Sequence, residues 1–126
     1  MPLVRIDLPD TTPDEELSAV SGLVHQALVD TFNVPGPDRF QTLARHPPRQ
    51  LICSEEFLGV THSAHVVFIQ IFCAPGRSQD MKKALFAEIV KQISSNCSFS
   101  AADVIINLVE TSRENWSFGN GMMQLS

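Results

Sequence analysis

Pro2, directly after the initiator methionine, carries the most distinctive chemical group in this sequence. If Met1 is removed, the nitrogen of Pro2 becomes a free secondary amine, which can carry a proton or act as a nucleophile. Burial and a nearby positive charge both lower the pKa of such an amine, because they disfavour its protonated form. A proline at the first residue of a strand also has a purely structural explanation, since it costs the sheet no hydrogen bond.

Arg77 is the candidate for binding an anion. It lies in the turn Pro75–Ser78, between an apolar run and a predicted helix. There its guanidinium group and the N-terminal amides of the helix would together favour a carboxylate. Close to Pro2, it would also lower the pKa of the amine. An exposed arginine in a turn is the plainer interpretation.

Asp38 lies in a proline-rich turn, where a carboxylate often serves only to stabilise the turn. As a functional group it would accept a proton from water or hold the protonated form of Pro2. If Asp38 keeps Pro2 protonated, the amine is a general acid toward a carbonyl oxygen. If desolvation and Arg77 dominate, the amine is a base. The sequence leaves both possibilities open.

The composition describes one globular domain over residues 1–126, with 44% hydrophobic and 18% charged residues. The formal net charge of -5 argues against a nucleic-acid-binding face and favours small molecules or other subunits as partners. The longest apolar stretch, Val66 to Ala74, is too short to span a bilayer, and no targeting segment is visible. We therefore expect a soluble, cytoplasmic protein without membrane partners.

Neither the cysteines nor the histidines show the spacing of metal ligands. The cysteines are odd in number and contain no C-x-x-C pair, which predicts reduced structural thiols: Cys53, Cys73 and Cys97. The histidines do not gather on one face of one element: His25, His46, His62 and His65. We expect no metal site.

The first part of the chain predicts a strand followed by a helix. Leu3 to Leu8 alternates apolar and polar residues, as in a half-buried strand. Thr12, Pro13 and Glu15 predict a capping box at the start of a helix that ends near Phe32. The apolar face of this helix consists of Leu17, Val20, Val24, Ala27, Leu28 and Thr31.

The remaining chain repeats this pattern. Phe40 to Ala44 predicts a short strand, and Leu51 to Ser54 is a weaker candidate for another. His65 to Cys73, rich in Val, Ile and Phe, predicts a strand buried on both faces. Ser78 caps a predicted second helix, and Asp103 to Glu110 is the last predicted strand. The second helix has an apolar face of Leu85, Phe86, Ile89, Val90 and Ile93.

The order strand, helix, strand therefore occurs twice, and we expect an α/β (α+β) fold of doubled β-α-β units. Each crossover makes a parallel pair of strands. Right-handed connections would put both helices on one face of the sheet or stack two units about a pseudo-twofold axis.

Four short motifs, in this order, resemble the tautomerase superfamily, and within it malonate semialdehyde decarboxylase and its relatives. They are Pro2 after the initiator methionine, Val34-Pro35 leading to Asp38-Arg39-Phe40-Gln41, Gly76-Arg77-Ser78, and Glu110 leading to Trp116-Ser117-Phe118-Gly119. The resemblance covers nearly the whole chain. It implies a homotrimer whose subunits are doubled β-α-β units.

The resemblance also implies a site and a chemistry. Pro2 would be the catalytic amine, Asp38 would orient or activate water and Pro2, and Arg77 would hold the carboxylate of the substrate. Trp116 and Phe118 match aromatic positions of the pocket wall, although both suit a core equally well. No cofactor is implied. Some decarboxylases of the family carry an Arg-Pro-Arg turn where this chain has Ala74-Pro75-Gly76-Arg77, which weakens the expectation of decarboxylation.

Three functions remain open from the sequence. The first is an enzyme similar to malonate semialdehyde decarboxylase, acting on a small oxo carboxylic acid with Pro2 as the proton carrier. The second is keto-enol tautomerisation of a 2-oxo acid such as phenylpyruvate. The third is a trimeric binding protein without catalysis, in which Met1 stays attached and Pro2 is an amide without basicity.

Overall fold

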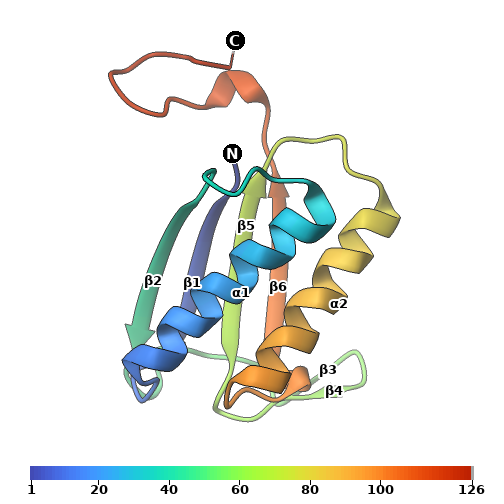
Figure 1. The fold of residues 1–126 in the computed structure, drawn as a ribbon. Coiled ribbons are helices and arrows are strands. Elements are labelled where there is room, and N and C mark those ends of the chain that lie inside the picture. The colour runs from blue at the N-terminus through green and yellow to red at the C-terminus, as the bar shows by residue number, and fades with distance from the viewer. Residues whose placement is uncertain (126) are drawn as a thin grey trace.

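The fold is a four-stranded sheet with both helices on one of its faces (Figure 1). It is seen in a computed structural model, which describes residues 1–125. The two long helices are α1 (Asp14–Phe32) and α2 (Gln79–Asn96). The strands of the sheet are β1 (Leu3–Pro9), β2 (Phe40–His46), β5 (Val67–Cys73) and β6 (Val104–Glu110), in the spatial order β2-β1-β5-β6.

The pairing of the strands confirms the doubled β-α-β units. β1 pairs in parallel with β2 and β5 in parallel with β6, each pair being joined through one of the helices. The two units meet where β1 and β5 pair antiparallel, with Ile6 opposite Ile69. The start of β1 therefore lies beside the end of β5.

The helices cover an apolar layer that excludes water from one face of the sheet. Ile6, Ile69 and Ile71 of the central strands are each 1% exposed or less, as are Leu28 of α1 and Leu85 of α2. These side chains belong to one buried cluster, which fixes the positions of the strand ends.

The expectation that the third long strand is buried on both faces is wrong. Burial alternates along β5, because only the face that carries Val67, Ile69 and Ile71 is covered by the helices. Phe68 and Phe72 lie on the opposite face and are half-buried. That opposite face has no second layer among the described residues.

The predicted capping box at α1 is also wrong. The N-cap is Pro13, and the buried hydroxyl of Thr12 donates to the carbonyl of Pro9 at 2.7 Å, within the turn that follows β1. At α2 the prediction is confirmed, because Ser78 Oγ accepts a hydrogen bond from the Met81 amide at 3.2 Å.

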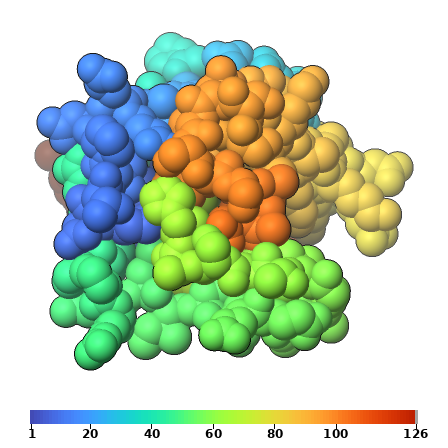
Figure 2. Space-filling model, turned by 90° about the horizontal axis from the view of Figure 1, so that it is seen from below, coloured from blue at the N-terminus to red at the C-terminus, as the bar shows by residue number. Residues whose placement is uncertain are grey.

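The strand predicted at Leu51–Ser54 is absent, because this segment pairs with no strand. The long connection from β2 to β5 contains a small hairpin a few residues later. The hairpin consists of β3 (Glu56–Phe57) and β4 (Val60–Thr61), and its turn residues Leu58 and Gly59 both have positive φ. Figure 2 views the molecule from the end opposite to the chain start, and this green segment occupies one side of that end.

Two short 3-10 helices flank β6, namely η1 (Ala101–Asp103) and η2 (Arg113–Asn115). After η2, the C-terminal segment stands off the sheet at the end where the chain starts (Figure 1). Within residues 1–125 there is no helix of the length and apolar character that crossing a bilayer requires.

Candidate active site

The start of the chain, the C-terminus of α1 and the N-terminus of α2 all lie at one end of the sheet (Figure 1). The antiparallel pairing of β1 and β5 puts Pro2 beside Cys73, and the end of β6 lies on the other side of Cys73. The loop after α1, the loop between β5 and α2, and the segment after β6 therefore meet around the first residues of the chain.

A pocket of about 150 Å³ lies at this end and brings together three residues that the sequence predicted to act together: Pro2, Asp38 and Arg77. Pro2 is buried, whereas Asp38 and Arg77 are half-buried. Met1, still attached in this chain, also lines the pocket. The pocket is thus small, is lined by charged residues and includes Pro2 in its wall.

The loop after α1 carries Asp38 to the pocket. Asn33 ends the helix with a positive φ of 57°, which turns the chain, and Val34 is buried as an anchor. His25 of α1 contacts the carbonyl of Gly36 at 2.8 Å, and the Asp38 amide donates to Pro35 at 2.9 Å. The carboxylate of Asp38 forms an ion pair with the α-amino group of Met1.

Arg77 is held from the other side of the pocket. Its guanidinium group donates to the carbonyls of Ala74 and Phe32, both at 3.3 Å, and lies 4.9 Å from the centre of the Phe32 ring. Gly76, with a φ of 122°, makes the turn that allows this approach. Arg77 has no ion pair with any residue of the part of the chain that the structure describes.

The surroundings change the acidity of two groups at this pocket. Burial and, second, the positive charge of Arg77 hold the pKa of the Met1 α-amine below its ordinary value. Burial raises the pKa of the Cys73 thiol, although Arg77 opposes this effect. Cys73 therefore stays protonated and is a poor nucleophile at neutral pH. All three cysteines are free thiols.

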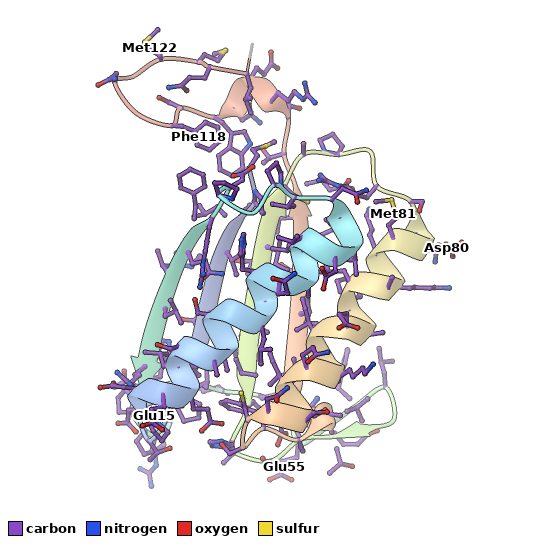
Figure 3. All side chains as sticks on the ribbon, in the orientation of Figure 1. Glu15, Glu55, Asp80, Met81, Phe118 and Met122 are labelled. Carbon is purple, nitrogen blue, oxygen red and sulfur yellow. The ribbon has the colours of Figure 1, made fainter. Side chains whose placement is uncertain are left out.

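The predicted aromatic residues lie beside this pocket and do not line it. Phe118 lines an adjoining hollow of about 260 Å³, together with Met1, Asp38 and Phe40. Figure 3 shows Phe118 pointing from the C-terminal segment toward the start of the chain. Trp116 stacks on Phe118 with 5.4 Å between ring centres, and its buried indole N–H has no partner among residues 1–125. The two rings thus form a wall over the chain start.

Arg113 is the charged pocket residue that the sequence analysis missed. It is the first residue of η2 and lines the same pocket as Asp38 and Arg77. Its place three residues after the end of β6 could have indicated that Arg113 lies at the same end of the sheet as Pro2. Over residues 1–125, no cluster of three His, Cys, Asp or Glu side chains could hold a metal ion.

Known proteins are similar to this chain in sequence and in fold. Two family models, each described as a tautomerase enzyme, match residues 38–119 and residues 2–60. The probable tautomerase YusQ of Bacillus subtilis (strain 168) is 30% identical, with 99% of this chain and 98% of YusQ covered.

Solved structures give the same result. FG41 malonate semialdehyde decarboxylase inhibited by 3-bromopropiolate is 36% identical, with a TM-score of 0.90 and 97% and 92% of the two chains covered. A malonate semialdehyde decarboxylase described with decarboxylase and hydratase activities is 32% identical, with a TM-score of 0.89 and 98% and 95% covered.

A more distant structure, a fused 4-OT symmetric trimer, is 17% identical with a TM-score of 0.79 over 95% and 94% of the chains, and shares the fold. The doubled β-α-β sheet, the residues gathered around Pro2 and the family matches over most of the sequence lead to one conclusion. This chain belongs to the tautomerase superfamily, near malonate semialdehyde decarboxylase.

Proposed function

We propose that this protein, once Met1 is removed, is a cofactor-independent enzyme that uses the nitrogen of Pro2 to move a proton on a small oxo carboxylic acid. The observation that carries the proposal is the shared pocket, in which buried Pro2 lies with Asp38 and Arg77. Arg77 binds the substrate carboxylate, because its remaining N–H donors face no acidic partner among the described residues.

Pro2 and Asp38 divide the proton chemistry. Burial and Arg77 already lower the pKa of an α-amine at this place, and the same causes act on the nitrogen of Pro2 after processing. Asp38, which holds the α-amine in an ion pair, then orients the amine or a water molecule beside it. In a decarboxylation, the protonated amine polarises the carbonyl oxygen while the bond to the departing CO₂ breaks.

Keto-enol tautomerisation of a 2-oxo acid such as phenylpyruvate is the second candidate reaction. One observation favours it: the turn before α2 reads Ala74-Pro75-Gly76-Arg77 and lacks the first arginine that some decarboxylases of the family carry. In this reaction neutral Pro2 takes a proton from the enol oxygen and returns a proton to carbon, with Arg77 holding the carboxylate.

We further propose that the functional unit is a homotrimer. The fused 4-OT neighbours are trimers, and the sheet face opposite the helices carries half-buried Phe68 and Phe72 without a second layer among the described residues. A neighbouring subunit would cover such a face.

The decisive experiment measures intact mass and then treats the same sample with 3-bromopropiolate. A mass that lacks one methionine, followed by an adduct mapped to Pro2, is the expected result. Retained Met1 without an adduct would instead favour a trimeric binding protein without catalysis, because Pro2 would then be an amide.

Kinetics of three variants complete the test. Pro2→Ala keeps an amine but loses the ring, and we expect the rate constant kcat to fall about 10²-fold or more. Arg77→Ala should mainly raise KM for an oxo acid. Arg49→Ala is the control, since Arg49 lies at the opposite end of the sheet and lines no part of this pocket. Full activity in both site variants would contradict the assignment.

A further inference from the structure

The charges around the pocket do not balance. Four charged groups line it: the Met1 α-amine, Asp38, Arg77 and Arg113. Asp38 is the only acid among them, and its carboxylate is paired with the α-amine. Two guanidinium groups are therefore left facing one small pocket without a carboxylate partner among residues 1–125. Two like charges in one place repel each other unless anions are bound there.

Arg113 differs from Arg77 in how it is held. Arg77 is anchored by the carbonyls of Ala74 and Phe32 and by the Phe32 ring. Arg113 has no hydrogen bond or ion pair with any of the residues that the structure describes, and it is exposed at the rim. An arginine presents five N–H donors in a planar group that matches a carboxylate. All of these donors remain available for a ligand.

The backbone before Arg113 is nevertheless fixed. The amide of Thr111 donates to the carbonyl of Cys73 at 2.8 Å and ties the end of β6 to the end of β5. Asn115 closes the short helix by donating its amide to Ser112 at 3.0 Å. The position of Arg113 thus follows from the pairing of β6 with β5, whose last residue, Cys73, lines the pocket.

We propose that Arg113 binds a second anionic group of the substrate, so that the site selects small oxo acids with two carboxylates over those with one. The inference rests on the function proposed above and names its substrate class. Arg77 takes one carboxylate at the pocket floor, and Arg113 takes the other at the rim. The volume of about 150 Å³ equals that of about five water molecules, which restricts the spacer between the carboxylates to a short one.

Calorimetric titration of the processed protein with succinate, malonate and propionate tests this directly. Ionic strength is held constant, because salt screens such contacts. We expect the better of the two diacids to bind at least tenfold more tightly than propionate. Arg113→Gln should remove that preference and leave propionate binding unchanged within about twofold, and Arg113→Lys should retain part of it.

Arg49→Gln is the matched control, since it removes the same charge at the far end of the molecule and should leave the diacid preference intact. Equal affinity of the native protein for propionate and both diacids would overturn the inference. So would a diacid preference that survives in Arg113→Gln or disappears equally in Arg49→Gln, because the effect would then come from overall charge.

Labelling of Pro2 by 3-bromopropiolate is measured on the same samples and separates this inference from the proposed function. A labelled Pro2 together with equal binding of mono- and diacids keeps the function and refutes the role of Arg113. An unlabelled Pro2 together with a diacid preference that depends on Arg113 supports the anion site and refutes the amine chemistry. Thermal unfolding of each variant confirms that the fold is retained.

Discussion

The acidity of one amine decides what this site can do. The α-amine touches the Asp38 carboxylate, yet burial and the charge of Arg77 keep its pKa below the ordinary value. A lower pKa leaves more of the amine neutral at pH 7, which is what the proposed role of Pro2 as a base requires. Asp38 and Arg77 thus act on the same nitrogen in opposite directions.

Replacing Arg77 with Met should raise the pKa of the α-amine in the chain that carries Met1. The reason is that Arg77 is one of the two causes that lower it, and burial, the larger cause, remains. The chain is expressed with methionine aminopeptidase inhibited, and the pH dependence of α-amine acylation is followed by peptide mass spectrometry. Arg49→Met serves as the control. An unchanged acylation profile in Arg77→Met would show that the guanidinium does not act on the amine.

The sequence predicted three pocket residues and missed a fourth. Pro2 was singled out by its place after Met1, whereas Asp38 and Arg77 were matched through the resemblance to the tautomerase superfamily and suit a site because they lie in breaks between regular elements. Arg113 was missed, because its place in the pocket depends on the pairing of β6 with β5, which no local pattern reveals. Trp116 was predicted for the pocket wall, but it stacks on Phe118 and does not line the hollow that Phe118 lines.

At the scale of elements, Asp103 joins the segment before β5 to the start of β6. Its carboxylate accepts hydrogen bonds from the Ser63 amide at 2.8 Å, the Ser63 hydroxyl at 2.6 Å and the Ser100 hydroxyl at 3.0 Å. Burial alone would raise the pKa of Asp103, but these hydrogen bonds outweigh it and hold the pKa below the ordinary value of 3.8. The charged form therefore stabilises the fold.

Asp103→Asn should lower the free energy of unfolding by about 1–3 kcal/mol at pH 7, because hydrogen bonds to a buried charged acceptor are lost. A carboxyl whose pKa is depressed in the folded state contributes stability above pH 3.8, and this contribution is lost as pH falls through the folded-state pKa. Urea unfolding of both proteins from pH 7 to pH 2.5 should therefore show the difference shrinking. Exposed Asp10→Asn is the control, and a difference independent of pH would contradict the role of the charge.

The start of α2 gives a second prediction at the scale of elements. Ser78→Ala should destabilise the protein by about 0.5–2 kcal/mol, since the Met81 amide loses its side-chain partner. Ser78→Asp should restore most of the loss, because a carboxylate also accepts that hydrogen bond. Urea unfolding measures both variants, and equal stability of Ser78→Ala and the native protein would show that the cap contributes nothing.

Most long elements could be predicted from periodicity, and the errors have local causes. Thr12 has the residue type of an N-cap, but its hydroxyl is used by Pro9 in the preceding turn. Val, Ile and Phe in β5 suggested burial on both faces, whereas the helices cover only one face. Leu51–Ser54 does not form a strand, because a strand needs a neighbouring strand to pair with, and the composition of a segment does not show whether such a neighbour exists.

At the scale of the whole molecule, the uncovered face of the sheet is the feature that calls for a neighbour. One row across it is apolar, with Phe72 opposite Leu3 and Val109, and Phe40 opposite Leu3. A further pair, Phe68 and Ile105, lies on the same face. Such a face, if it were open to water, would favour association of subunits.

Phe68→Lys should therefore dissociate the proposed trimer, because a charge would be buried between subunits. Sedimentation velocity should give a trimer for the native protein and a smaller species for Phe68→Lys. Ser95→Lys, an exposed position on α2, adds the same charge away from the face and should remain trimeric. A native protein that sediments as a monomer would contradict the proposed assembly.

The antiparallel meeting of β1 and β5 has one more consequence, which concerns stoichiometry. The two β-α-β units are equivalent in topology, so the start of β5 corresponds to the start of β1 at the opposite end of the sheet. The start of β5 lies inside the chain, however, and every backbone nitrogen there belongs to a peptide bond. Because the two units form one polypeptide, only one α-amine is available for two equivalent strand starts. Chemistry that needs an α-amine can therefore take place at the start of β1 but not at the start of β5.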